Sequence, residues 1–114
     1  SINGSGHEKL DFTYIDDLVH GVMCVIEEEK AKNQTFNLTF GEARTIGELS
    51  EILKNNFPKI NINYQSKDKF TPDRGTLNID KAIEMIGYKP ENPIESGYLK
   101  YINWYKNFWE NISK

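Results

Sequence analysis

The sequence has little that would place the protein outside the cell or in a membrane. It contains one cysteine, so no disulfide can form within the chain. It has no run of about 18 apolar residues that could span a bilayer. Its first residues, SINGSGHEKLDF, lack the apolar core of a signal peptide. We therefore expect a cytoplasmic protein without a membrane partner, in which Cys24 is a small, buried apolar residue rather than a nucleophile.

No strong charge of one sign is present either. The 14 Lys and Arg residues are nearly balanced by 17 Asp and Glu residues, giving a net charge of −3. Because no basic patch is found, we expect no nucleic-acid partner. The content of 38% hydrophobic and 27% charged residues is typical of a globular protein. With no internal linker or repeat, residues 1–114 are predicted to form a single domain.

The chain also lacks the patterns that most catalytic sites require. His7 and His20 are too far apart for a metal-binding HExxH pair, and no GxxxxGK phosphate loop is present. The glycines Gly4 and Gly6 form too short a stretch for a dinucleotide fingerprint, and they precede a predicted strand instead of following one. No tyrosine is followed four residues later by a lysine. We therefore predict no catalytic, cofactor-binding or metal-binding residue in this chain.

The residues that are present predict an α/β fold with about four helices and a few short strands. Strands are expected at residues 10–15, 35–40 and 60–63. Helices are expected at about residues 16–29, 45–56, 79–86 and 94–112. The last helix carries more aromatic residues than one narrow face can hold, so some of them must meet another surface or remain exposed.

Three helix ends carry capping signals. Asp16 or Asp17 is expected to accept backbone N–H bonds at the start of the first helix. Thr45 and Glu48 have the spacing of a capping box at the start of the second. Gly87 is expected to end the third helix in a left-handed conformation.

The long polar loop at residues 66–76, SKDKFTPDRGT, is the strongest candidate for a binding segment. Loops of this length in compact domains are often functional. It contains Arg74, one of only two arginines in the sequence. A guanidinium can bind phosphate through its fork of donors, but spacing alone does not distinguish such a ligand from a solvated surface arginine.

The order of these segments resembles the C-terminal, substrate-binding part of the extended short-chain dehydrogenase/reductases, the NAD-dependent nucleotide-sugar epimerases and dehydratases. The matching elements are a Gly-x-Gly loop at residues 4–6 and then, in chain order, LDFTYIDDLV, TFNLTFG, TPDRGTLNIDKA and MIGYKP. The resemblance covers nearly the whole chain, and DFTYIDD and IGYKP are specific only in combination.

The resemblance implies that this chain is one lobe, a fragment of a larger two-lobed enzyme. The N-terminal Rossmann domain, absent here, would bind NAD and carry the catalytic residues, while this lobe would bind a nucleoside diphosphate sugar. It implies that Arg74 binds the diphosphate and that Phe12 approaches the nucleotide, although Phe12 can also be read as a buried strand aromatic. Leu10 stands where the family usually has another arginine, so a clamp of two arginines is not expected.

The lobe is therefore expected to bind no NAD and to be inactive by itself. The sequence does not reveal the sugar, the nucleobase, or whether the full-length enzyme catalyses epimerisation or dehydration. An alternative is a non-enzymatic interaction domain that holds a protein partner with its aromatic C-terminal helix. A lobe separated from its Rossmann domain would also expose apolar surface, so self-association is expected.

Overall fold

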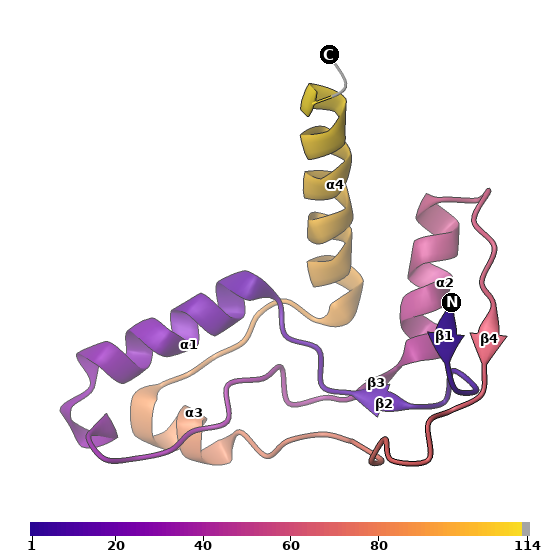
Figure 1. Ribbon diagram of the computed structural model, residues 1–114. Coiled ribbons are helices and arrows are strands. Elements are labelled where there is room, and N and C mark those ends of the chain that lie inside the picture. The colour runs from indigo at the N-terminus through magenta and orange to yellow at the C-terminus, as the bar shows by residue number, and fades with distance from the viewer. Residues whose placement is uncertain (113–114) are drawn as a thin grey trace.

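The computed structural model, which describes residues 1–112, has four α-helices and four two-residue strands (Figure 1). The helices are α1 (Ile15–Glu27), α2 (Ile46–Asn56), α3 (Asp80–Ile86) and α4 (Ile94–Ile112), and a 3₁₀ turn, η1 (Glu29–Ala31), follows α1. The strands are β1 (Ile2–Asn3), β2 (Lys9–Leu10), β3 (Arg44–Thr45) and β4 (Tyr64–Gln65). The predicted class, about four helices with a few short strands, is confirmed.

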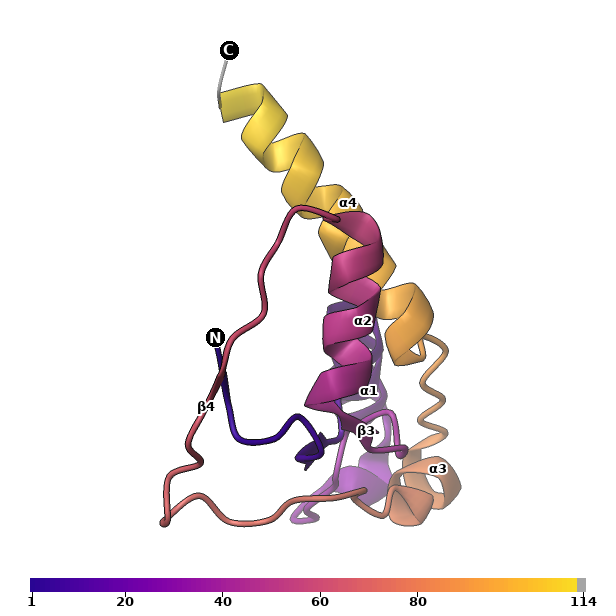
Figure 2. The same ribbon diagram turned by 90° about the vertical axis from the view of Figure 1, so that its right-hand side faces the viewer.

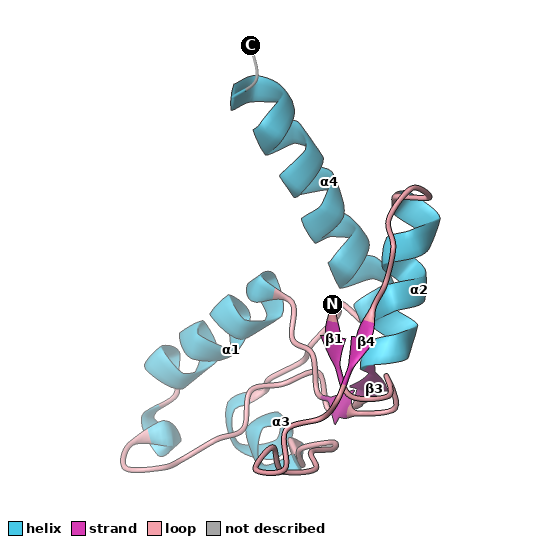
Figure 3. Cartoon of the chain, turned by 45° about the vertical axis from the view of Figure 1, so that its right-hand side comes forward, coloured by secondary structure: helices cyan, strands magenta, loops and turns pink. Residues whose placement is uncertain are grey.

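The strands form two separate pairs near the start of α2 (Figure 3). β1 and β4 are parallel, with Ile2 opposite Tyr64, and β2 and β3 are antiparallel, with Leu10 opposite Arg44. Two of the three strand predictions were wrong, and the third was wrong in its limits. Among the described residues, 35–40 and 60–63 form no strand, and the strand expected at 10–15 pairs only at Leu10. An extended segment becomes a strand only where a second strand supplies hydrogen bonds, which a local pattern does not reveal.

The helix ends test the capping predictions. In α2, Thr45 Oγ1 accepts a bond of 3.1 Å from Glu48 N–H, and the Glu48 carboxylate accepts one of 2.7 Å from Thr45 N–H. The capping box is therefore confirmed, and the Thr45 N–H bond lowers the pKa of the Glu48 carboxyl. Gly87 ends α3 with φ of 66°, as predicted for a left-handed cap.

The predicted cap of α1 was wrong. The helix begins after Tyr14, and no side chain caps it. The carboxylate of Asp17 is only 4% exposed, and it accepts bonds of 3.0 Å from Glu91 N–H and 2.9 Å from Asn92 N–H. The Asn92 side-chain amide donates a third bond of 2.8 Å. Asp17 therefore binds the turn before α4, far along the chain, rather than its own helix end.

The fully buried core is small. Its centre is formed by Ala31, Ala82, Ile86 and Tyr88, with Cys24 among the half-buried residues packed against it. Tyr88 is 1% exposed, and its hydroxyl donates a 3.0 Å bond to Thr39 O. Burial, reinforced by the nearby carboxylates of Asp17 and Asp11, raises the pKa of Tyr88 to about 12. This core joins α1, η1 and α3 and leaves most of α4 outside it.

The molecule is flat and open. Its radius of gyration is 16.9 Å, whereas a compact chain of this length would have about 13 Å. Its accessible surface is 8304 Å², whereas a compact monomer of this mass would expose about 6,400 Å². Helix α4 projects away from α1 and α3 (Figures 1 and 2). The excess surface of about 1,900 Å² matches one side of a large protein interface.

Two groups of apolar side chains account for much of this open surface. The α1 apolar face consists of exposed residues on that helix: Ile15, Leu18, Val19, Val22, Met23 and Ile26. The exposed aromatic residues of α4 are Tyr101, Trp104, Tyr105, Phe108 and Trp109. The aromatic residues predicted to exceed one face of the last helix are therefore exposed in the described chain.

Candidate functional site

The loop at residues 66–76 connects β4 to α3 along one edge of the molecule (Figure 2). Every residue of this loop is exposed. Its last residue, Thr76, is held by a 2.9 Å bond from Ala43 N–H to Thr76 Oγ1. The loop therefore has few packing contacts, and its position depends on polar contacts at its ends.

Arg74 and β2 line a hollow of about 430 Å³. We call it the arginine hollow, and its lining includes Lys9, Leu10, Ile46, Lys67, Asp73 and Arg74. A volume of this size is within the range of small-molecule sites, about 300–1,000 Å³. The loop, β2 and the start of α2 thus form one concave surface although they are far apart in sequence.

Two of the cations that line the arginine hollow are available to bind a ligand, because they form no ion pair within residues 1–112. Lys67 is ion-paired with Asp73, whose carboxylate raises the pKa of the Lys67 ammonium. Within residues 1–112, neither Arg74 nor Lys9 has an ion pair or a side-chain hydrogen bond. Two unpaired cations on one concave surface suit a ligand with two negative charges, such as a diphosphate diester.

The arginine hollow is also lined by a carboxylate, that of Glu8, which is already hydrogen-bonded. The Glu8 carboxylate accepts bonds of 3.1 Å from Ser5 N–H and 2.8 Å from Gly6 N–H. These bonds, together with one from its own N–H, lower the pKa of the Glu8 carboxyl. Backbone donors therefore stabilise the charge on Glu8, and they are not free to bind a phosphate.

The other arginine has a structural role. Arg44 forms ion pairs with Glu42 at 3.6 Å, with Glu48 at 3.1 Å and with Glu95. The charges of these glutamates raise the pKa of the Arg44 guanidinium although partial desolvation opposes them. Arg44 thus joins β3, α2 and α4, which leaves Arg74 as the arginine available to a ligand.

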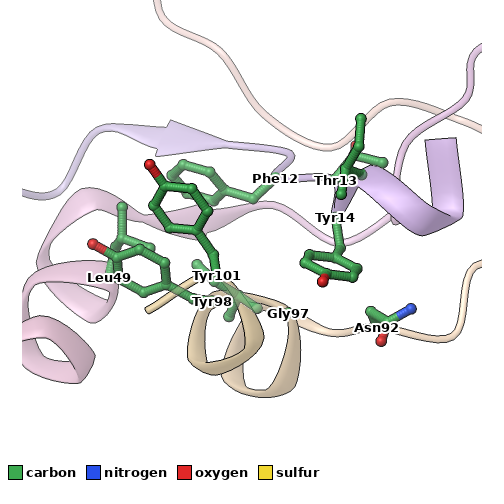
Figure 4. Close-up of a pocket in the computed structure, with 10 residues that line it drawn as sticks. Phe12, Thr13, Tyr14, Leu49, Asn92, Gly97, Tyr98 and Tyr101 are labelled. Carbon is green, nitrogen blue, oxygen red and sulfur yellow. The ribbon is translucent and has the colours of Figure 1, made fainter. Parts of the chain in front are cut away.

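Phe12 lies in a different hollow from Arg74. This second hollow has a volume of about 260 Å³, and Figure 4 shows Phe12, Tyr98 and Tyr101 around it. Leu49 of α2 and Gly97 of α4 complete its mainly apolar wall. The two residues predicted to bind substrate are therefore not brought together within this chain.

The described residues contain no cluster that could hold a metal ion. Among residues 1–112, no three His, Cys, Asp or Glu side chains lie close enough to hold a metal ion. His7 Nδ1 is 3.2 Å from Ser5 Oγ, and His20 Nε2 is 3.5 Å from Cys24 Sγ. In this part of the chain, no helix is long and apolar enough to cross a membrane.

The sequence pattern missed Lys9 as a member of the hollow. The available signal was its place beside Leu10, the position where the resemblance shows an arginine missing. A lysine one residue away would ordinarily point to the other face of a strand. Only the pairing of β2 with β3 and the course of the loop place Lys9 on the same hollow as Arg74.

Comparisons with known proteins identify relatives along nearly the whole chain. No protein-family model matches it. A putative UDP-glucose 4-epimerase of Methanocaldococcus jannaschii is 29% identical over 107 residues, which are 93% of this chain and 34% of that protein. The dTDP-4-dehydro-6-deoxyglucose reductase of Escherichia coli is 31% identical over 102 residues, 89% of this chain and 32% of that protein.

Solved structures that resemble this fold include epimerases, as the sequence relatives do. An epimerase from Methanothermobacter thermautotrophicus superposes with a TM-score of 0.91 and 25% identity, covering 98% of this chain and 34% of that one. The UDP-glucose 4-epimerase of Thermotoga maritima, solved with UDP-glucose, gives a TM-score of 0.85 at 25% identity and covers 95% and 35%. The chain thus spans about a third of the length of the proteins it matches.

Proposed function

Because the chain belongs to the extended short-chain dehydrogenase/reductases and corresponds to the C-terminal part of their nucleotide-sugar epimerases and dehydratases, we propose that it binds a nucleoside diphosphate sugar. The observation that carries this proposal is the arginine hollow, where Arg74 and Lys9 are cations without an ion pair among residues 1–112. Arg74 would bind the diphosphate through charge-assisted hydrogen bonds. Phe12, with the aromatic residues beside it, would lie toward the nucleoside end of the ligand.

The glycine-containing segment at residues 4–6 does not fit a dinucleotide. A dinucleotide cradle needs free backbone N–H groups at the start of a helix. The glycine-containing segment at residues 4–6 leads into β2 instead, and the N–H groups of Ser5 and Gly6 already donate to Glu8. We propose that NAD belongs to a Rossmann domain of the full-length enzyme and that residues 1–114 have no turnover alone.

The α1 apolar face is the surface that such a domain would cover. Its six apolar side chains are exposed, with Ile26 at 70% and Ile15 at 58%. The excess surface of about 1,900 Å² is enough for one side of a permanent interface. In this proposal, the fold of residues 1–112 is open because its apolar faces belong between two domains.

A binding and turnover assay tests the proposed function. Full-length protein and residues 1–114 are titrated by calorimetry with UDP-, dTDP-, GDP- and CDP-glucose, and each is assayed with NAD. We expect one nucleotide sugar to bind to the full-length protein and only that protein to turn it over. Turnover by residues 1–114, or no binding of any of the four to the full-length protein, would contradict the proposal.

Self-association tests the role of the α1 apolar face. We expect residues 1–114 alone to form oligomers that grow with concentration, because exposed apolar surface is removed from water on association. Light scattering measures the mass of the particles. The double substitution Val19→Glu and Val22→Glu should shift the chain toward monomer, whereas Lys59→Glu, at an exposed site outside this face, should not. A strict monomer at high concentration would count against this role.

The competing candidate, a non-enzymatic interaction domain, is favoured by the exposed aromatic residues of α4. It predicts a natural start codon near Ser1. A Rossmann fingerprint and a Tyr-x-x-x-Lys pair encoded upstream support the enzyme instead.

A further inference from the structure

The Asp11 carboxylate joins Leu77, the residue after the loop at 66–76, to the segment at residues 39–41. Asp11 Oδ2 accepts a 3.1 Å bond from Leu77 N–H and a 3.0 Å bond from Thr39 Oγ1. Its other oxygen, Oδ1, accepts a 3.1 Å bond from Gly41 N–H. Asp11 directly follows β2, so it connects the strand that lines the arginine hollow to the residue where the loop ends.

We propose that Asp11 is a positioning residue that holds Arg74 at the arginine hollow. The inference rests on the proposed function, because it assumes that Arg74 binds the diphosphate. Arg74 is three residues before Leu77, so fixing the Leu77 backbone limits Arg74 to within about 10 Å of that point. Thr76, bonded to Ala43 N–H, supplies a second anchor on the same side.

The other contacts of the loop cannot position Arg74 as firmly. The ion pair of Lys67 and Asp73 is open to solvent, with the Asp73 side chain 95% exposed, and exposed pairs contribute little. The bond from Thr71 N–H to Asp68 O is local to the loop. The bond to Asp11 is charge-assisted, and its partners come from outside the loop, so it restrains the loop more strongly.

A carboxylate is the side chain that this junction requires. Both of its oxygens accept bonds and neither donates, which suits the two backbone N–H groups and the hydroxyl that face Asp11. An asparagine could keep its oxygen toward Leu77 and Thr39 and lose only the Gly41 bond. Asp11→Ala is therefore the substitution that removes the Leu77 bond.

A double-mutant cycle in the full-length protein tests the inference. Calorimetry measures the affinity of each variant for one nucleotide sugar. The ligand is whichever of UDP-, dTDP-, GDP- or CDP-glucose binds the unsubstituted protein most tightly. We expect Asp11→Ala to weaken binding about five- to tenfold when Arg74 is present and less than about twofold in the Arg74→Ala background. Equal losses in the two backgrounds would overturn the positioning role. If Arg74→Ala alone leaves affinity unchanged, the assignment of Arg74 fails instead.

Two further variants separate positioning from general stability. Thr39→Val removes one bond to Asp11 but leaves the Leu77 bond, so we expect a lower melting temperature with unchanged affinity. Should circular dichroism show that Asp11→Ala is unfolded, Thr76→Val replaces it in the cycle, since it removes the second anchor of the loop. A loss of affinity in Thr76→Val that does not depend on Arg74 would also overturn the proposal.

Discussion

Replacing Arg74 with alanine in the full-length protein is expected to weaken nucleotide-sugar binding by about 1.5–3 kcal/mol, the range for hydrogen bonds to charged groups. The substitution removes an unpaired guanidinium from a hollow in which Lys67 is already neutralised by Asp73. Arg74 has no hydrogen bond or ion pair within residues 1–112, so its loss should leave the fold intact. Calorimetric titration measures the affinity, and thermal denaturation checks the stability.

A matched control distinguishes a specific contact from the general charge of the loop. Lys69→Ala removes another exposed cation from the same loop, at a residue that does not line the arginine hollow. We expect its affinity to change by less than about 0.5 kcal/mol. Equal losses for the two variants would mean that the loop acts only through its net charge. No loss for Arg74→Ala would make Arg74 a surface residue.

Replacing Asp17 with alanine is expected to destabilise the protein by about 3 kcal/mol. The Asp17 carboxylate is 4% exposed and receives three hydrogen bonds from Glu91 and Asn92. Alanine would leave these donors without a partner at the junction of α1 and α4. Urea denaturation, followed by circular dichroism, measures the free energy of unfolding.

The neighbouring residue provides the control for Asp17. The Asp16 side chain is exposed and has no hydrogen bond among residues 1–112, so Asp16→Ala should change the unfolding free energy by less than about 0.5 kcal/mol. Asp17→Asn should fall between the two, since one amide oxygen can still accept. If Asp16→Ala proves as costly as Asp17→Ala, then capping of α1, as the sequence predicted, is the better explanation.

The helices could be predicted because their signals are local. Thr45 and Glu48 are three residues apart, and a capping box between them depends only on the torsions of one helical turn. The left-handed Gly87 likewise requires only that a helix ends there. The strands could not be predicted to the same extent, because a strand also needs a partner. The segment at residues 35–40 has the sequence pattern of a strand but pairs with no other strand among the described residues.

The candidate site was predictable in part. A lone arginine in a long polar loop indicated Arg74, and the structure places it on a concave surface. Lys9 was missed because no pattern shows which strand residue faces a loop some 65 residues later. Phe12 was expected to approach the nucleotide, and it lies in the second hollow with Tyr98.

The sequence by itself determined the helices and their caps at Thr45 and Gly87, because each depends on residues close together in the chain. It also determined the family resemblance, which depends only on the order of motifs along the chain. The roles of its acidic and basic side chains were decided only by the tertiary structure. Asp17 accepts hydrogen bonds from the backbone of Glu91 and Asn92, far along the chain. Arg44 is ion-paired with three glutamates, whereas Arg74 has no ion pair within residues 1–112. Charged groups act on whatever the fold brings within a few ångströms of them, and that distance is unrelated to their separation in sequence.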